Sequence, residues 1–334
     1  NESSCVSDSI THDSTAAVAV ISSTPSSLTS ESSYDIDVQT DNGLVSYQYA
    51  LTLSTAQCSA ASYNGSWVSH DTNISGTLST PGSWMICVIG KDAAGNSQNS
   101  ADATSFSWEY DNIQPTVTIA STSSDPTNAN VIPMTVTFSE NISGFVVGDI
   151  NVAGGSAGDL AGSNNSYTFN LTPTAAGTLT VDIAAGVVND PVGNGNTAAT
   201  QFSIVYDNEP PTSISLSIAS GNAATNNTNV PLSLSANDAA QMYITNTAGC
   251  ASGGSWEDYA TTRSWTIAQS NTTASVFAKY RDALGNESSC ISDTIDHDGV
   301  APTVVLGSTP STLTSDPAYD IDVLTDDGVD TYQY

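Results

Sequence analysis

The chain of 334 residues carries 34 acidic and only 4 basic residues, which gives a formal net charge of −30 at pH 7. Nucleic acid and anionic membrane surfaces repel such a polyanion, so neither is expected as a partner. No apolar run approaches the ~18 residues that a membrane-spanning helix needs, so no segment is expected to insert into a membrane.

Short stretches in which apolar residues alternate with Ser, Thr or Asp predict half-buried β-strands. In chain order they cover residues 34–40, 133–139, 166–172, 177–183, 200–206, 213–219 and 230–236. Helical spacing extends over no more than about two turns anywhere in the chain. Gly, Asn and Pro separate the strands every ~8–12 residues, which is typical of β-sandwiches and barrels. The predicted fold class is therefore all-β.

A second recurring pattern marks links between domains: a strand ends, an Asp follows, and a short segment leads into another strand. The pattern occurs at residues 9–21, 108–119, 204–216 and 294–306, and the last three copies contain Pro. The links separate units of about 95 residues, a usual size for a β-sandwich. The predicted domains are 14–111, 112–207 and 208–298, with the last strand of a preceding domain at 1–13 and the start of a following one at 299–334. Because the links are short and Pro stiffens them, we expect an extended rod.

The chain also repeats itself at a distance of 285 residues. Residues 1–49 align with residues 286–334 and are identical at 30 of these 49 positions. Self-similarity at a fixed period indicates a repeat array. The sequence begins without an initiator Met and stops within an expected strand. We therefore expect a fragment of a longer chain that contains one full period and the start of the next.

Residues 138–207, from "FSENISGFVVGDINVAGG" to "TAATQFSIVYD", resemble the bacterial Ig-like repeats of giant surface adhesins and biofilm-associated proteins. The flanking units, with "SYQYAL", "DAAGN" and "SWEYD", resemble a related Ig or fibronectin-type variety from the same kind of protein. The resemblance implies tandem Ig-like β-sandwiches in the extracellular stalk of a bacterial cell-surface protein. It also implies stiffening by calcium between domains, with the adhesive head elsewhere in the polypeptide.

The motif D-x-x-G-N occurs at residues 92–96, 190–194 and 282–286. In an Ig-like sandwich the incoming link, the loop after strand B and the loop between strands F and G meet at one end. Acidic residues occupy all three places, so we expect their carboxylates to converge. The expected groups are Asp13, Asp41 and Asp92; Asp111, Glu140 and Asp190; Asp207, Asp238 and Asp282; and Asp298 with Asp326.

Crowded carboxylates repel one another unless a cation lies among them, and oxygen ligands on flexible loops suit Ca²⁺. The Gly of the motif permits a positive φ, and the Asn can cap the turn or supply a carbonyl oxygen. The alternative is a simple Asx-type turn, in which the Asp carboxylate accepts bonds from backbone amides and no ion binds. Asp35 and Asp37 recur as Asp320 and Asp322, and this pair is expected to form a solvated strand face.

The five cysteines favour an oxidising compartment. Disulfides are expected between Cys58 and Cys87 and between Cys250 and Cys290. Cys5 is the repeat equivalent of Cys290, so its partner is expected to precede the sequence. No C-x-x-C pair is present, so neither zinc nor a redox motif is expected.

No motif for nucleophilic, zinc-dependent or phosphate-binding catalysis is present, so no enzymatic activity is expected. His12, His70 and His297 lack recurring partners, and we expect structural or exposed roles for them. Lys91 and Lys279 lie near the D-x-x-G-N turns, where charge balance is favoured over a Lys–Asn isopeptide crosslink. The five Trp residues are expected at core or strand-edge positions, and an exposed pair that stacks on sugars is the alternative.

Two function classes are consistent with the sequence. In the first, the chain is a covalent stalk whose partners are further copies of its own repeat in the same polypeptide. In the second, identical chains pack into an extracellular fibre or sheath. The charge favours the first, because like charges oppose lateral packing unless divalent cations neutralise them. A sugar-binding or protein-binding module is a third class, which rests on the Trp residues alone.

Overall fold

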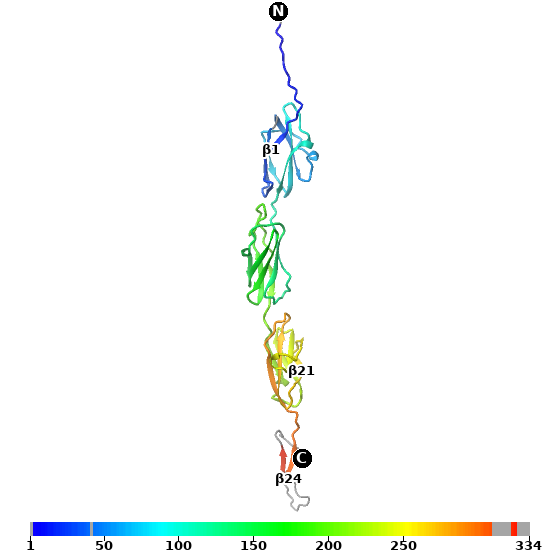
Figure 1. Cartoon of the computed structure of the whole chain (residues 1–334), viewed down its shortest axis with the longest axis vertical. Helices are drawn as coiled ribbons and strands as arrows, with labels where there is room; N and C mark the ends of the chain where they lie inside the picture. Colours follow the sequence, from blue (N-terminus) through cyan, green and yellow to red (C-terminus); the bar gives the residue numbers. More distant parts are fainter. Residues whose placement is uncertain (1–2, 41–42, 309–321, 326–334) are drawn as a thin grey trace, which may run out of the picture. The chain divides into compact units, whose positions relative to one another are not determined.

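The computed structural model describes residues 3–40, 43–308 and 322–325. Within these ranges every regular element is a β-strand or a short 3-10 turn, and no helix is long and apolar enough to cross a membrane. The all-β prediction is thus confirmed. The chain divides into two compact units, with Asn1–Ser124 and Asn130–Ile204 in unit 1 and Asp125–Ala129 and Val205–Tyr334 in unit 2. Figure 1 shows the strands of the chain, coloured along the sequence.

The first sandwich of unit 1 combines a three-stranded and a five-stranded sheet. The three-stranded sheet has the order β1-β3-β6, with β1 at Ala19–Ser23, β3 at Ser33–Thr40 and β6 at Ile74–Thr77. The five-stranded sheet has the order β2-β8-β7-β4-β5, with β2 at Leu28–Thr29, β8 at Thr104–Tyr110, β7 at Gly82–Asp92, β4 at Leu44–Leu53 and β5 at Val68–Ser69. The short strand β2 runs parallel to β8, whereas the other neighbours in the two sheets are antiparallel.

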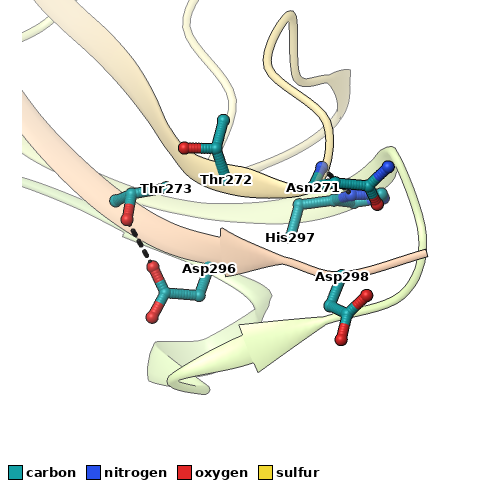
Figure 2. Close-up of a pocket in the computed structure, with 6 residues that line it drawn as sticks. All are labelled: Asn271, Thr272, Thr273, Asp296, His297 and Asp298. Carbon is teal, nitrogen blue, oxygen red and sulfur yellow. Dashed lines mark hydrogen bonds between the residues drawn. The ribbon is translucent and has the colours of Figure 1, made fainter. Parts of the chain in front are cut away.

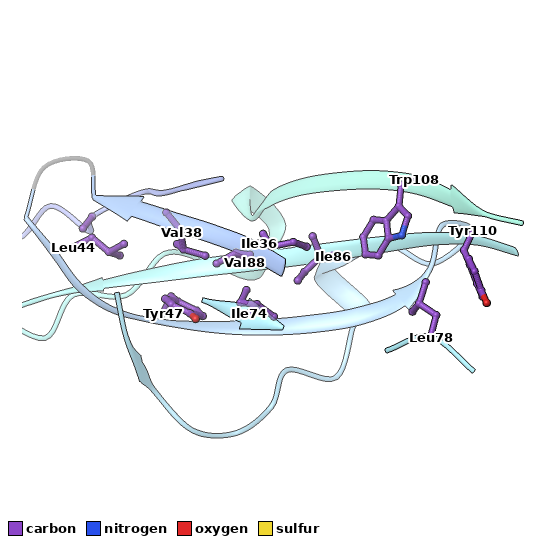
Figure 3. Packing of buried hydrophobic residues seen from close by; sticks show 12 residues of the cluster. Ile36, Val38, Leu44, Tyr47, Ile74, Leu78, Ile86, Val88, Trp108 and Tyr110 are labelled. Carbon is purple, nitrogen blue, oxygen red and sulfur yellow. The ribbon is translucent and has the colours of Figure 1, made fainter. Parts of the chain in front are cut away.

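The core of this sandwich lies between its two sheets (Figure 3). Ile36 and Val38 of β3 face Tyr47 of β4 and Ile86 and Val88 of β7, and all five side chains are almost fully buried. Burial of such apolar side chains contributes roughly 1.5–3 kcal/mol each relative to exposure, so this contact is the main force that holds the two sheets together.

The second sandwich of unit 1 also has two sheets. One has the order β12-β13-β10-β9, with β12 at Gly155–Ser163, β13 at Ser166–Pro173, β10 at Ile132–Phe138 and β9 at Val117–Ser121. The other has the order β11-β14-β15, with β11 at Ile150–Ala153, β14 at Gly177–Ile183 and β15 at Phe202–Tyr206, whose last two residues are assigned to unit 2. Phe138, Phe145 and Tyr167 pack edge to face in its core.

Unit 2 contains a third sandwich. A three-stranded sheet of order β16-β18-β21 comprises β16 at Thr212–Ile218, β18 at Asn229–Asn237 and β21 at Thr262–Thr266. A five-stranded sheet of order β17-β23-β22-β19-β20 comprises β17 at Ala224–Thr225, β23 at Ile291–His297, β22 at Thr272–Arg281, β19 at Gln241–Thr245 and β20 at Trp256–Asp258. Strand β17 runs parallel to β23, as β2 does to β8. The unit also holds an antiparallel pair of β24 at Val304–Ser308 and β25 at Asp322–Thr325.

The strands form where period-two alternation predicts them. In β10, the buried residues Ile132, Met134, Val136 and Phe138 alternate with exposed ones. All seven predicted stretches overlap strands, namely β3, β10, β13, β14, β15, β16 and β18. The predicted domain boundaries and the extended rod stay predictions.

Candidate functional site

Each D-x-x-G-N motif forms a tight turn after a central strand, with its first residue at the end of β7, after β14 or after β22. The Gly residues at the fourth position, Gly95, Gly193 and Gly285, have φ values of 97°, 100° and 90°. Each Gly amide donates to the carbonyl oxygen of the motif's first residue at 3.2, 3.3 and 3.3 Å, respectively. The turn therefore needs the conformation that Gly adopts at least cost. We call the first and last residues of each turn the motif Asp (Asp92, Asp190, Asp282) and the motif Asn (Asn96, Asn194, Asn286).

The motif Asp closes the turn with its side chain. Asp190 Oδ1 accepts bonds from the amides of Val192, Gly193 and Asn194 at 2.9, 2.7 and 2.8 Å. Its counterparts in the other two motifs accept equivalent amide bonds, and all three motif Asp residues are at most 5% exposed. The hydrogen bond from the Asn96 side chain, assisted by backbone amides, lowers the pKa of Asp92 below its ordinary value. The Asx-type turn proposed as an alternative is thus formed, but it occupies chiefly Oδ1.

The motif Asn connects this turn to an Asp at the start of the same sandwich, which we call the linker Asp (Asp13, Asp111, Asp207). The Nδ2 group of Asn96, Asn194 and Asn286 donates to Oδ2 of the motif Asp at 2.9, 2.8 and 2.8 Å. The same nitrogen donates to the backbone carbonyl oxygen of the linker Asp at 3.1, 3.0 and 3.0 Å. Sequence reasoning offered the Asn only as a cap or a carbonyl ligand and missed this connection.

The linker Asp is held by its own backbone and side chain as well. The amides of Asp111 and Asp207 donate to the carbonyl oxygens of Thr29 and Thr127, each at 2.9 Å. The carboxylate Oδ1 of each linker Asp accepts from the amide two residues later, at 2.9 Å for Thr15 and Ile113 and 3.0 Å for Glu209. Asp298 shares both features, with an amide bond to Thr225 and an acceptor bond from Val300, each at 2.9 Å. The recurring T-S or T-N dipeptide at these Thr residues is the sequence signal that identifies the anchor.

Two of the expected carboxylate groups come together in the structure. Asp111, Glu140 and Asp190 form one cluster in unit 1, and Asp207, Asp238 and Asp282 form the other in unit 2. In each cluster one carboxylate oxygen per residue lies within 4.8 Å of the others. The Asp111 cluster borders an open pocket of about 230 Å³ that Leu28, Asn141 and Val192 also line. Each cluster joins the linker Asp, an acidic residue that closely follows β10 or β18, and the motif Asp, as the Ig-like topology predicts.

The Asp111 cluster is electrostatically unbalanced. Burial, followed by repulsion from Asp111 and Asp190, raises the pKa of Glu140. No donor among the described residues bonds the Glu140 carboxylate, although Asp190 has several. The atoms of this cluster that could coordinate a metal ion are all carboxylate oxygens, and none is nitrogen or sulfur. Hard cations such as Ca²⁺ prefer oxygen ligands of this kind. The residues present therefore fit a cation of this class.

Other expected metal ligands lie partly outside the described residues. Asp41 and Asp326 belong to the residues that the structure does not describe, so the groups around Asp92 and Asp298 stay predictions. Asp35 is exposed on β3, and Asp37 accepts a 2.7 Å hydrogen bond from Ser22 Oγ. Asp320 and the side chain of Asp322 also lie outside the described residues.

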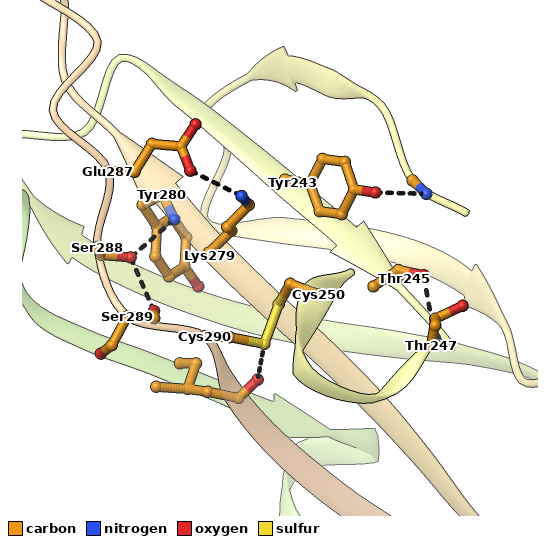
Figure 4. The surroundings of a disulfide bond; sticks show 12 residues. Tyr243, Thr245, Thr247, Cys250, Lys279, Tyr280, Glu287, Ser288, Ser289 and Cys290 are labelled. Atoms are coloured by element: carbon orange, nitrogen blue, oxygen red, sulfur yellow. Dashed lines mark hydrogen bonds and ion pairs between the residues drawn. A yellow bond between two sulfur atoms is a disulfide. The ribbon is translucent and has the colours of Figure 1, made fainter. Parts of the chain in front are cut away.

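Both expected disulfides are formed. Cys58, in a 3-10 turn, is bonded to Cys87 of β7, and Cys250, in a second such turn, is bonded to Cys290 just before β23 (Figure 4). Cys5 is free and exposed. The first disulfide ties the loop after β4 to the neighbouring strand β7, and the second ties the loop after β19 to the segment between β22 and β23.

Three of the four basic residues lie against aromatic rings, and the fourth, Arg263, forms a 2.9 Å ion pair with Glu257. Lys91 Nζ is 5.1 Å from the ring centre of Trp67, and Arg281 is 4.3 Å from that of Trp256. Lys279 forms a 2.7 Å ion pair with Glu287, which agrees with charge balance, and also lies over the ring of Trp256 at 5.3 Å. These cations cover ring surface that a sugar would need for stacking. A Lys or Arg directly before the motif Asp is the signal in the sequence for this arrangement.

His297 is buried next to a linker Asp, at a position where the other sandwiches have Tyr110 and Tyr206. Its Nδ1 accepts from the amide of Asn271 at 3.0 Å, and its buried Nε2 has no partner among the described residues (Figure 2). The ring contributes to the wall of an open pocket with Asp296 and other polar side chains. His12 and His70 are exposed and partly exposed, respectively.

Comparison with known proteins gives one family match over part of the chain and several similar solved structures. Residues 111–206 match the family model of the bacterial Ig-like domain. A tetra-tandem repeat from the extending region of a large adhesion protein is 18% identical, with 84% of this chain and 74% of that chain covered and a TM-score of 0.27. The FN1–FN3 domains of chicken CNTN1 are 9% identical, with coverage of 84% and 97% and a TM-score of 0.27. The BSP domain of a biofilm-associated protein is 15% identical, with coverage of 57% and 30% and a TM-score of 0.20.

No curated protein matches the chain. The matched family is not enzymatic, in agreement with the expectation from the sequence. Its match includes Asp111, Glu140, Asp190 and Asn194, and therefore the complete carboxylate cluster and the turn beside it. Over residues 111–206 the chain is therefore similar to bacterial Ig-like domains.

Proposed function

We propose that the chain is part of the stalk of a large extracellular protein on a bacterial cell surface. In this proposal the sandwiches follow one another as an extended rod, disulfides close the first and third, and Ca²⁺ stiffens the joints. The adhesive head lies elsewhere in the polypeptide. The observation that carries the proposal is the recurrence of one carboxylate cluster at the linker end of two successive sandwiches, Asp111–Glu140–Asp190 and Asp207–Asp238–Asp282.

The residues of each cluster couple three parts of a sandwich. Asp111 belongs to the linker, Glu140 follows β10, and Asp190 begins the D-x-x-G-N turn. A bound Ca²⁺ supplies positive charge that offsets the repulsion among these carboxylates. Asp111 holds the linker backbone through its bonds to Ile113 and Thr29, so the position of its carboxylate affects the direction of the chain at the joint. Ion binding is therefore expected to restrict that direction.

The charge of the chain supports a stalk of single chains over a laterally packed fibre. A net charge of −30 opposes contact between parallel copies, and a few structural ions per period leave most of that charge in place. The fibre stays the alternative outcome of the test. Location outside the cell is supported by the two disulfides, because such bonds persist in oxidising compartments.

The test is small-angle X-ray scattering with in-line mass determination on the 334-residue chain, in millimolar Ca²⁺ and in excess chelator. We expect a monomer in both, with a larger and narrower distribution of end-to-end distances in Ca²⁺. Glu140→Gln is expected to reduce the response, whereas Asp159→Asn, which changes an exposed carboxylate of the same sandwich, leaves it intact. A mass that climbs with Ca²⁺ would support the fibre instead, and a monomer whose scattering ignores Ca²⁺ would remove the ion from the proposal.

A further inference from the structure

We infer that the motif Asn is a positioning residue that fixes the linker to the D-x-x-G-N turn without any cation. The inference deepens the proposed function, on which its importance for stalk stiffness rests, but the contact itself does not depend on Ca²⁺. All three motif Asn residues form the same two bonds, to Oδ2 of the motif Asp and to the carbonyl oxygen of the linker Asp. The arrangement recurs in three sandwiches, whether or not all members of the carboxylate cluster are described.

The chemistry of the contact selects Asn. A primary amide has two hydrogens on one nitrogen, so Nδ2 can donate to a carboxylate and to a carbonyl oxygen at the same time. The Asn194 amide also donates to Asp190 Oδ1 at 2.8 Å, which holds the Asn backbone in place. A Ser at this position would have one donor, and an Asp would have none while adding a charge beside Asp190. A hydrogen bond from an amide to a carboxylate, as to Asp190 Oδ2, is stronger than one between two neutral groups.

The clamp and the cation use different atoms of the same linker residue. Asn194 holds the backbone carbonyl oxygen of Asp111, whereas the cation would bind its carboxylate. The amide of Asp111 is held separately by Thr29. The peptide groups on both sides of the Asp111 Cα are therefore fixed before an ion arrives. Consequently the joint has a part that a chelator does not release.

In unit 2 a further side chain contacts the same turn. Asn128 Nδ2 donates to the carbonyl oxygen of Leu284 at 2.9 Å and to Oδ1 of Asn286 at 3.2 Å. Asn286 thus accepts one bond with its side-chain oxygen while its nitrogen donates two. This acceptor bond orients the amide so that Nδ2 faces Asp207 and Asp282. The clamp of unit 2 consequently uses both ends of the Asn side chain.

The test is amide hydrogen exchange on the full chain, in excess chelator and in millimolar Ca²⁺, for Asn194→Ala, Asn194→Asp and a control, Asn170→Ala. The control removes an exposed bond of the same sandwich, from Asn170 Nδ2 to Asp159 at 2.9 Å. The readout is the amide of Ile113, which donates to Asp111 Oδ1. In chelator we expect its exchange to rise about fivefold to tenfold in Asn194→Ala, as the loss of the bond to the Asp111 carbonyl oxygen predicts. Asn194→Asp is expected to raise it further, and Asn170→Ala to leave it unchanged.

The outcomes separate the clamp from the ion. If Asn194→Ala and the control exchange alike at Ile113, the positioning role is wrong, whatever Ca²⁺ does. If Asn194→Ala accelerates exchange while Ca²⁺ has no effect on the unmodified chain, the clamp stands and the proposed ion role fails. Asn286→Ala, read at the amide of Glu209, repeats the test in unit 2 and covers the case in which Asn194→Ala fails to fold. Equal exchange at Glu209 with and without that substitution would also overturn the inference.

Discussion

Asn194 Nδ2 lies 3.0 Å from the backbone carbonyl oxygen of Asp111, a residue 83 positions earlier in the sequence. The bond closes the second sandwich at the point where its chain begins. Asn96 and Asn286 do the same for Asp13 and Asp207, so the feature belongs to the repeat and not to one sandwich. Each D-x-x-G-N turn thus supplies the motif Asp and, through its Asn, a bond to the linker.

Glu140→Gln should weaken Ca²⁺ binding and remove a source of repulsion from the ion-free protein. Fewer charged ligands lower Ca²⁺ affinity, and we expect a loss of about tenfold or more. The rise in unfolding temperature on adding Ca²⁺ should shrink accordingly, because ligand stabilisation follows the ratio of ion concentration to Kd. Differential scanning calorimetry in Ca²⁺ and in chelator measures the unfolding temperature with and without the ion, and the difference between the two is the Ca²⁺ response. An unchanged Ca²⁺ response, equal to that of Asp159→Asn, would contradict the assignment.

Acidification should destabilise the first sandwich through Asp92. The Asn96 side chain and backbone amides hold the pKa of Asp92 below its ordinary value of 3.8. A carboxyl group with a lowered folded-state pKa stabilises the fold above its unfolded pKa, and this contribution is lost as the pH falls through the folded value. Urea unfolding between about pH 5 and pH 2 should therefore show a shallower loss in Asp92→Asn than in the unmodified chain. Asp35→Asn, at an exposed carboxyl, should follow the unmodified chain; a parallel slope in Asp92→Asn would refute the role of Asp92.

Gly193→Ala should destabilise the second sandwich through backbone strain alone. Gly193 has a φ of 100°, and a Cβ at this position would meet no atom within 4 Å. The expected cost is about 1–2 kcal/mol, since a non-Gly residue is disfavoured in this region. Gly148→Ala is the matched control, because its Cβ would also meet nothing and its φ lies outside the restricted range. Equal midpoints of urea unfolding for the two variants would show that the turn tolerates a side chain.

Reduction should destabilise the first and third sandwiches but not the second. The disulfides close loops with sequence separations of 29 and 40 residues, whereas the described residues of the second sandwich include no cysteine. Loops of this length correspond to a stabilisation of about 3–4 kcal/mol in the chain-entropy description. Calorimetry with and without reductant should move two transitions and leave the third in place. The paired variant Cys58→Ala/Cys87→Ala should move only the transition of the first sandwich.

Alternation along the chain predicted the strands, and the Ig-like topology predicted the carboxylate clusters. In β10 and β14 buried and less buried residues alternate, and this burial follows the alternation of apolar and polar residues in the sequence. The meeting of Asp111, Glu140 and Asp190 follows from the order of strands in an Ig-like sandwich, which the resemblance supplied. Both predictions therefore needed only sequence pattern and topology.

Contacts that depend on backbone atoms or on side-chain direction were not predictable in the same way. The hydrogen bond from Asn194 is accepted by a backbone carbonyl oxygen, which every residue has. The identity of the residue at position 111 therefore does not predict this hydrogen bond. The Thr29 and Thr127 anchors likewise use main-chain oxygens. The contact of Arg281 with Trp256 requires knowledge of which face of β22 is outward. A residue type that recurs at the equivalent place in two or three sandwiches was the available signal in these cases.

The two disulfides also determine how far the chain can lengthen under tension. If a pulling force unfolds the first sandwich, the segment between Cys58 and Cys87 stays closed. At ~3.5 Å per extended residue, the closed loop, with a sequence separation of 29, reduces the length that the unfolded sandwich can reach by about 100 Å. The loop between Cys250 and Cys290, with a sequence separation of 40, reduces the extended length of the third sandwich by about 140 Å on the same basis. The second sandwich, whose described residues include no disulfide, can release its whole length, so the chain combines two sandwiches of limited extension with one of full extension.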